Sequence, residues 1–540
     1  MLLDISRARS GETIASGRGA VVLGTLCAVP TALWLLDETF DDRFAGTYAA
    51  LNGLAVLLAY TGTTAFGLNL VLGARLHVVD RLFGGLDRVY RAHRLTGEAA
   101  FTFLLAHVVL VVASRATVSR EAAVDLLGPG AGLAVFAGVL AFSAMTVSML
   151  LTVFARLGHE VFVYVQRSFG VVFLAGTYHA LTVDSSEGST VLRVYLVVVA
   201  TAGIAAFAYR SVLGSVLVRR RPYRVVSVNR LDEHVIEIVM EPRGRPLSYE
   251  PGQFLFVNFR SLALVDELRP FELSAQRQIL AIRPGEIATQ FHPFSITSSP
   301  DESMLRITVK ALGDYTSALR LLEPGAEAVV EGPFGSFSHR RVPSRRQAWA
   351  AGGIGVTPFL SMARSLAADD PTQVTFYYCV EREEEAHFLA ELRAIESSRS
   401  GFRVVLVARD RHGLLTGARL ALEHRDLPGT DVLVCGPPAM IESLRTQLEA
   451  EGLPRDRFHA EEFSFARLGG EGSPQTAHRP GGRMRSQRTS DARLIVALGM
   501  LALAALVFAA GLAIGGSIAA DSPAPPVTES VDQDATGSGR

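Results

Sequence analysis

Cysteine is scarce in this chain of 540 residues, and its scarcity excludes several classes of protein. Only Cys27, Cys379 and Cys435 are present, and no Cys-x-x-Cys pair occurs. A small disulfide-stapled scaffold needs many more cysteines, and an all-cysteine iron–sulfur cluster needs four thiolates. The usual structural zinc patterns also need paired cysteines. The sequence therefore predicts neither a disulfide framework nor a cysteine-held metal centre.

Charged residues are also few. They make up 19% of the chain, with 52 basic and 53 acidic residues, whereas 49% of the residues are hydrophobic. A net charge of -1 excludes a globally basic nucleic-acid binder, so we expect no nucleic-acid partner. The apolar content excludes disorder as the main state.

The charges are unevenly spread, and long runs contain none. These runs are 19–36, 44–74, 99–114, 126–155, 168–183, 194–209 and 494–520. A membrane-spanning helix needs about 20 mostly apolar residues, and the shorter runs qualify when their charged ends reach the interface. We therefore expect six spanning helices before residue 210 and a seventh at 494–518, in a lipid bilayer. A signal peptide is the alternative for the first run, but 1–18 carries both acids and bases, and no clear cleavage site follows.

Arginine orients the predicted bundle, because Lys and Arg concentrate on the cytoplasmic side. The basic ends carry Arg75, Arg81, Arg88, Arg91 and Arg94 in the expected loop between spans two and three, then Arg156, Arg167, Arg219, Arg220 and Arg221. The opposite loops carry Asp37, Glu38, Asp41, Asp42, Asp184 and Glu187. We therefore expect a multi-pass protein of the cell membrane whose large polar region is cytoplasmic.

The polar region shows two successive patterns of apolar residues. Short apolar segments at 223–229, 234–241, 252–259, 305–310 and 328–330 predict an antiparallel β-barrel. From residue 347 apolar strands alternate with helical patterns, which predicts a parallel α/β sheet of nucleotide-binding type. The expected organisation is an N-terminus (1–18), a six-helix membrane domain (19–218), a β-barrel domain (219–341), an α/β domain (342–466), a linker (467–493), a C-terminal spanning helix (494–518) and an outer tail (519–540).

Histidines inside a membrane bundle are costly, so each is a functional candidate. His93 and His107 lie on the third expected span, about 21 Å apart at 1.5 Å per residue, and His179 lies on the fifth. Imidazole is a common axial ligand of haem iron. We therefore predict these three residues as haem ligands, although a histidine bonded to a neighbouring helix is the alternative for each.

The segment 87–97 with His107 resembles the third helix of the ferric reductase and NADPH oxidase superfamily. Glu160, Phe162, Gln166, Arg167 and His179 match the fifth-helix pattern. The resemblance implies haem b bound by two histidines on each helix, but Gln166 stands where the inner histidine is expected. By analogy His107 and His179 bind an outer haem. The inner haem is then five-coordinate on His93, takes a sixth ligand such as His159 or His77, or is absent.

Four soluble segments resemble the ferredoxin–NADP reductase family. Segments 292–298 and 310–317 resemble its FAD signatures, and 331–335 resembles the turn that closes its barrel. The resemblance assigns FAD contacts to His292, Pro293, Phe294, Ser295, Lys310, Gly313, Thr316 and Ser317. It also places Phe465, in the segment 462–465, against the flavin. We expect Ser295 and Phe465 to act in the reaction at the flavin.

A glycine-rich turn between a predicted strand and helix indicates a dinucleotide site, because glycine lets backbone approach the phosphates. The residues expected to bind NAD(P)H are Gly352, Gly353, Gly355, Thr357, Pro358, Cys435, Gly436 and Pro437. The last three resemble the nicotinamide-side motif of the same family. Cys435 is a catalytic candidate or, alternatively, a buried thiol, and Arg382 could hold a 2′-phosphate or be an exposed charge.

Together these features predict a transmembrane flavohaem oxidoreductase. We expect it to pass electrons from cytosolic NAD(P)H through FAD and one or two haems to an extracytoplasmic acceptor, ferric iron or dioxygen. One alternative is a membrane-tethered flavin reductase with one haem or none. Another is a redox-regulated membrane scaffold or sensor. The sequence is compatible with an oligomer.

Overall fold

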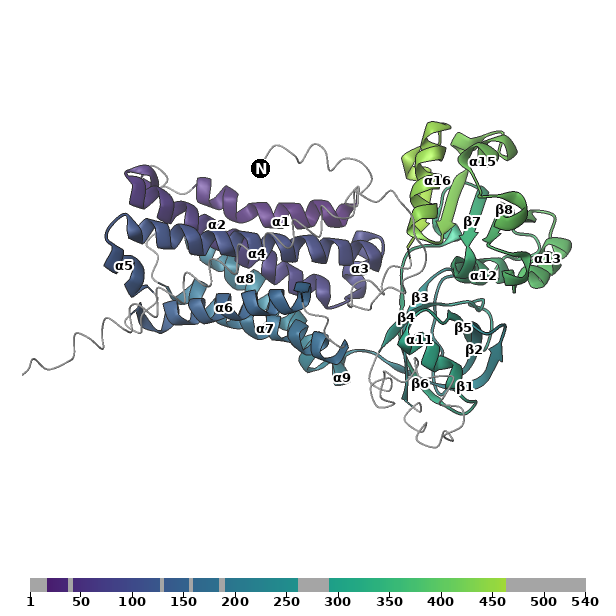
Figure 1. The fold of residues 1–540 in the computed structure, drawn as a ribbon, viewed down its shortest axis with the longest axis horizontal. Helices are drawn as coiled ribbons and strands as arrows, with labels where there is room; N and C mark the ends of the chain where they lie inside the picture. The colour runs from purple at the N-terminus through teal and green to yellow at the C-terminus, as the bar shows by residue number, and fades with distance from the viewer. Residues whose placement is uncertain are drawn as a thin grey trace, which may run out of the picture.

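The computed structural model describes residues 17–36, 42–126, 131–154, 159–183, 190–260 and 291–462. Phe465, the segment 261–290, the linker and the predicted C-terminal span lie outside these ranges. A long helical bundle forms one half of the described chain. A β-barrel and an α/β domain form the other half, at one end of the bundle (Figure 1).

The bundle is built from long apolar helices. They are α1 (Arg18–Leu35), α2 (Thr47–Gly73), α4 (Leu86–Ala116), α6 (Gly132–Phe154), α7 (His159–Thr182) and α8 (Thr190–Phe207), with short helices α3 (His77–Phe83), α5 (Arg120–Asp125) and α9 (Gly214–Leu217). Within the described ranges, five helices are long and apolar enough to cross a membrane: α1, α2, α4, α6, and α8 continued through a π-helical turn to Val212. The expected fifth span lies in α7, whose uncharged stretch starts only after Arg167.

Four of the five arginines expected in a loop between spans two and three are helical instead. Arg81 lies on α3, and Arg88, Arg91 and Arg94 lie on the first turns of α4, which begins at Leu86, whereas Arg75 lies in the turn before α3. For these four arginines the expected loop was wrong, because α3 occupies part of it and α4 begins 13 residues before the uncharged run at 99–114. The start of α4 is thus a basic helical end that points towards the soluble domains (Figure 1).

The barrel has six antiparallel strands in the order β4-β3-β6-β1-β2-β5. They are β1 (Arg221–Arg230), β2 (Val235–Pro242), β3 (Phe254–Phe259), β4 (His292–Ser295), β5 (Leu305–Lys310) and β6 (Glu327–Phe334). A bridge between Ile296 and Ile307 joins the two edges, so the predicted barrel is nearly closed. The first predicted flavin segment is itself the edge strand β4, which sequence patterning had not identified as a strand.

The α/β domain confirms the predicted parallel sheet. Its strands β7 (Arg346–Gly352), β8 (Gln373–Val380), β9 (Phe402–Ala408), β10 (Asp431–Cys435) and β11 (Phe458–Glu461) are ordered β11-β10-β7-β8-β9. Helices α12 (Thr357–Arg364) and α13 (Leu389–Ser398) cover one face, and α15 (Gly417–Glu423) and α16 (Pro438–Ala450) cover the other. The chain order changes direction at β7, so β7 and β10 flank the crevice where such sheets bind ligands.

The bundle and the barrel share one apolar cluster, called the junction below. Val79 and Phe83 of α3, and Leu86 and Val89 of α4, pack in it with Phe254, Phe256 and Phe334 of the barrel. The ring of His77 stacks on Phe334 with centroids 4.8 Å apart. The Ser336 hydroxyl donates to the carbonyl oxygen of Gly84. These contacts fix α3 against the barrel.

A buried ion pair crosses the junction. Arg210, in the π-helical turn after α8, donates from Nη1 to Oε1 of Glu331 on β6 at 2.5 Å. Arg220 Nε lies 3.8 Å from the other carboxylate oxygen. The Glu331 side chain is only 4% exposed, so its charge depends on these two guanidinium groups.

Removing this carboxylate should therefore destabilise the docked state. We expect Glu331→Ala to cost about 3 kcal/mol, because it leaves Arg210 without its buried partner. Thermal unfolding of the detergent-solubilised protein measures the change. The matched control is Glu381→Ala, which breaks an exposed pair with Arg409 and should cost less than about 1 kcal/mol. An equal loss of stability in both variants would contradict the role of Glu331.

Candidate functional site

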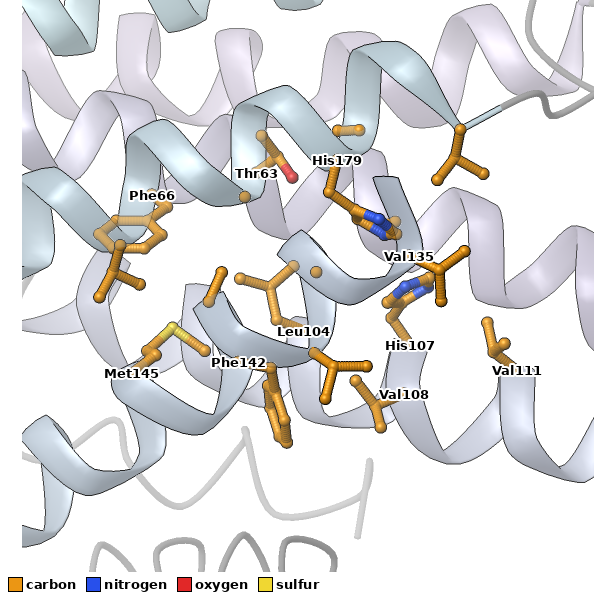
Figure 2. Close-up of a pocket in the computed structure, with 18 of the residues that line it drawn as sticks. Thr63, Phe66, Leu104, His107, Val108, Val111, Val135, Phe142, Met145 and His179 are labelled. Atoms are coloured by element: carbon orange, nitrogen blue, oxygen red, sulfur yellow. The ribbon is translucent and has the colours of Figure 1, made fainter. Parts of the chain in front are cut away.

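Two predicted haem ligands face each other across a cavity in the bundle. His107 on α4 and His179 on α7 point into a space of about 180 Å³ that apolar side chains of α2, α4, α6 and α7 line (Figure 2). The centroids of the two imidazole rings are 6.3 Å apart. The structure therefore brings together two residues that are 72 positions apart in the sequence.

Backbone carbonyl groups orient both rings. His107 Nδ1 lies 2.9 Å from the carbonyl oxygen of Ala55, and His179 Nδ1 lies 2.9 Å from that of Ala134. Because a carbonyl oxygen can only accept, each Nδ1 must carry the proton and donate. In a neutral imidazole the lone pair then sits on Nε2. In metal-binding histidines, the ring nitrogen that does not bind the metal commonly donates to a nearby oxygen in this way.

The separation of the rings fits one metal ion between them. A metal–imidazole bond is about 2 Å long and a ring centre lies about 1 Å from its nitrogen, so two axial imidazoles place their ring centres about 6 Å apart. The observed 6.3 Å agrees with this value. The donor set, two neutral imidazoles in apolar surroundings, suits haem iron.

The inner position differs. His93 Nδ1 donates to the carbonyl oxygen of Asn69 at 3.0 Å, and the Asn69 amide donates to the carbonyl oxygen of His93 and to Thr96 Oγ1. On α7, Gln166 Nε2 donates to Thr152 Oγ1 at 3.2 Å. A backbone carbonyl group therefore orients the His93 ring, as one does for His107. The side chain of Gln166, in contrast, is hydrogen-bonded to α6.

The other two candidate inner ligands do not change this arrangement. His77 stacks on Phe334 at the junction, so binding iron would require it to leave that contact. The side chain of His159 lies outside the described part. Among the described residues no group of three or more His, Cys, Asp or Glu side chains could hold a metal ion.

The predicted flavin segment contains an unpaired hydroxyl group. Ser295, at the end of β4, is 4% exposed, and its Oγ has no hydrogen-bond partner among the described residues. A buried hydroxyl group without a partner is costly, and a polar ligand at this edge would satisfy it. Beside it His292 stacks on Tyr315 with ring centroids 3.6 Å apart, while Pro293 and Phe294 pair with β3. The unpaired hydroxyl group of Ser295 at the edge of β4 is thus the observation that fits a bound flavin.

The second flavin segment begins the short helix α11 (Asp314–Ala318). The Thr316 hydroxyl oxygen accepts from the backbone N–H groups of Leu312 and Gly313. It is therefore part of the turn that shapes the segment. Lys310 ends β5, and the Ser317 N–H donates to the Gly313 carbonyl oxygen. A phosphate contact for these residues stays a prediction.

The two glycine turns of the α/β domain touch each other. A Cβ added to Gly355 would lie 2.2 Å from the Cys435 carbonyl oxygen, and one added to Gly436 would lie 3.1 Å from Gly352 Cα. Gly353 has a φ of +55°, a conformation that favours glycine. The predicted nucleotide residues at the ends of β7 and β10 therefore form one backbone surface, at the crevice where the sheet order reverses.

The remaining nucleotide candidates lie around this surface. Thr357 and Pro358 begin α12, and the Thr357 hydroxyl donates to the Ile354 carbonyl oxygen at 3.0 Å. Pro437 precedes α16. Cys435 is fully buried in the core, and burial raises the pKa of its thiol. A catalytic role for this thiol stays a prediction. Arg382 is exposed and pairs with Glu385.

Sequence reasoning missed the acidic side of the junction. Asp80 on α3 is 6% exposed, receives a backbone hydrogen bond from Gly335 and, because of its burial, has its pKa raised to about 6. Glu461 at the end of β11 is also buried, and burial together with nearby Asp87 raises its pKa. No motif marks these residues, although each is an acid within or beside an apolar segment.

Ser295 supplies a direct test of the flavin edge. We expect Ser295→Ala to weaken FAD binding about fivefold, because one hydrogen bond contributes about 1 kcal/mol. Flavin fluorescence during titration of the flavin-free full-length protein measures the change. Ser397→Ala, at an exposed position of α13, is the control. Unchanged FAD affinity in Ser295→Ala would remove this residue from the site.

Asp80 predicts a pH dependence of stability. Because its pKa is raised, the folded protein keeps a proton on Asp80 at pH values where the unfolded chain has lost it. Stability from this group is therefore greatest below about pH 4 and falls by up to about 3 kcal/mol as the pH rises to about 6. Asp80→Asn should remove this fall and raise the unfolding temperature at pH 7.5, whereas Asp369→Asn at an exposed position should not. An unaltered pH profile in Asp80→Asn would refute the assignment.

Two family models match the chain over these two sites. Residues 58–177 match the ferric reductase like transmembrane component, and residues 350–446 match the oxidoreductase NAD-binding domain. The first range contains His93 and His107, and the second contains both glycine turns.

Curated relatives resemble parts of the chain. The electron transfer component of 2-halobenzoate 1,2-dioxygenase from Burkholderia cepacia is 31% identical over 34% of this chain and 58% of its own length. Flavohemoprotein A of Dictyostelium discoideum is 24% identical over 43% and 57%. NADPH oxidase 1 of Mus musculus is 30% identical over 28% and 24%. The chain thus spans little more than half of the first two relatives.

The two matched regions belong to one chain, and the β-barrel lies between them in the sequence. The chain therefore carries one region similar to ferric reductase transmembrane components and another similar to oxidoreductase NAD-binding domains.

Proposed function

We propose that this protein is a transmembrane flavohaem oxidoreductase of the cell membrane. It takes reducing equivalents from NAD(P)H at its cytoplasmic domains and delivers electrons to ferric iron or dioxygen at the outer face. When bound, FAD accepts a hydride and haem carries single electrons. The bundle comprises six spanning helices in this proposal, with α7 as the sixth.

The facing pair of His107 and His179 carries the proposal. Both rings have their Nδ1 proton directed at a carbonyl oxygen, and their centroids have the spacing that suits one iron ion. A histidine that only braces two helices needs one hydrogen bond and no partner ring across a cavity. The pair is therefore better explained by a shared ligand than by packing.

The chain's own residues bind and orient the reactants. The dinucleotide phosphates lie against the backbone of the glycine turns at Gly352, Gly355 and Gly436, because glycine lets a ligand approach the backbone closely. Ser295 offers its hydroxyl group to the flavin ring at the barrel edge. The apolar side chains around His107 and His179 exclude water from the space between the two rings.

Haem content tests the proposal. We expect haem per FAD, measured by pyridine haemochrome against released flavin on detergent-purified protein, to be one or two. His107→Ala and His179→Ala should each remove the same haem, because they are its two ligands. His234→Ala, an exposed position on the barrel, is the control.

The ratio also decides the inner position. A ratio near two that falls near one in His93→Ala means that His93 holds an inner haem opposite Gln166. A ratio near one that His93→Ala leaves unchanged means a single outer haem. A ratio near zero would contradict transmembrane electron transfer and leave a membrane-tethered flavin reductase.

A further inference from the structure

A second cavity lies in the bundle, away from the facing histidines. It has a volume of about 270 Å³, and α1, α2, α3 and α4 line it. From α1 it is lined by Ala20, Leu23, Gly24 and Cys27. Three of these, Ala20, Gly24 and Cys27, have small side chains and share one helix face at spacings of four and three residues, so α1 leaves a groove beside α4 instead of filling it. This groove, called the α1–α4 groove, is used by none of the proposed electron-transfer residues.

The α1–α4 groove has one charged end. Arg88 and Arg91 line it at the start of α4, followed by Leu95 and, deeper in the bundle, Phe103. Arg91 is paired with Asp87 at 3.0 Å. For Arg88, in contrast, no carboxylate lies within ion-pairing distance among the described residues. The end nearest the soluble domains therefore carries net positive charge, while the rest of the groove is apolar.

The dimensions of the groove match one leaflet of a bilayer. From Arg88 to Phe103 the helix rises about 22 Å, and one leaflet with its headgroup region is about 20–22 Å thick. The two arginines then lie at the level of the lipid headgroups when the apolar part of α4 lies in the core. A basic pocket between helices at this level suits an anionic headgroup.

We propose that the α1–α4 groove binds one phospholipid with an anionic headgroup from the leaflet that adjoins the soluble domains. The guanidinium groups of Arg88 and Arg91 bind the headgroup phosphate, whose negative charge no headgroup cation offsets in an anionic phospholipid, and an acyl chain lies along Gly24, Cys27 and Leu95. A quinone fits the apolar part but offers no anion to the two guanidinium groups.

The site adjoins the junction. Phe83 and Ala92 line the groove and also pack in the junction cluster, and the ring of Phe83 contacts α1 at Gly19. A bound lipid therefore stabilises the position of α3 on which the barrel docks. The proposal depends on insertion in a membrane but not on the proposed reaction.

Native mass spectrometry of the delipidated full-length protein tests the site. We expect one phosphatidylglycerol to bind more tightly than phosphatidylcholine, by about fivefold for each arginine that contacts the headgroup. The double variant Arg88→Gln/Arg91→Gln should lose this preference. Arg94→Gln, an exposed arginine of α4 that does not line the groove, should keep it.

A second variant tests the apolar part. No atom lies within 4 Å of a Cβ added to Gly24, so Gly24→Leu fills the groove without a clash. It should reduce binding of phosphatidylglycerol while FAD content stays at the wild-type level, which shows that the variant is folded. Equal binding of the two lipids by the wild type, full binding by Gly24→Leu, an equal loss in Arg94→Gln, or retention of a quinone in place of phospholipid would each overturn the proposal.

Discussion

The carboxylate of Glu331 holds the two halves of the molecule together. It is buried between Arg210, which follows the last helix of the bundle, and Arg220, which precedes the first strand of the barrel. The buried carboxylate and guanidinium groups lose their hydration. Their mutual attraction offsets this loss only when the two domains dock so that the groups meet. The ion pair therefore selects one docked arrangement, and the surrounding apolar cluster stabilises it. The order of nucleotide, flavin edge and membrane histidines along the molecule depends on this docking.

Both candidate redox sites rely on the backbone to arrange their chemistry. In the bundle, carbonyl groups of α2 and α6 direct His107 and His179 at each other. In the α/β domain, two glycine turns meet so closely that a Cβ at Gly355 would lie 2.2 Å from the Cys435 carbonyl oxygen, and one at Gly436 would be in tight contact with Gly352. In each case the functional group has little freedom to reorient. Such fixed geometry lowers the cost of binding a rigid cofactor.

Much of the architecture could be predicted because its signals are local. Uncharged runs predicted the five helices that are long and apolar enough to cross a membrane, and the motif at Gly352–Gly353 predicted the turn after β7. The helical start of α4 could not be predicted from the charge pattern, because its arginines lie outside the uncharged run, and only the resemblance of the segment 87–97 to a family helix indicated it. The roles of Asp80 and Glu331 depend on contacts between distant segments, which no local pattern encodes. The His107–His179 pair was predicted by resemblance, whereas its orienting carbonyl groups required coordinates.

The junction joins segments that are synthesised far apart in time. The hydroxyl group of Ser336 reaches the Gly84 carbonyl oxygen across 252 positions of the chain. At about 5 to 20 residues per second, the ribosome needs on the order of tens of seconds to make that span. During this interval the apolar face of α3 at Val79 and Phe83 has no barrel to cover it. The nascent chain must therefore keep this face at the membrane surface or under a chaperone until β6 is complete.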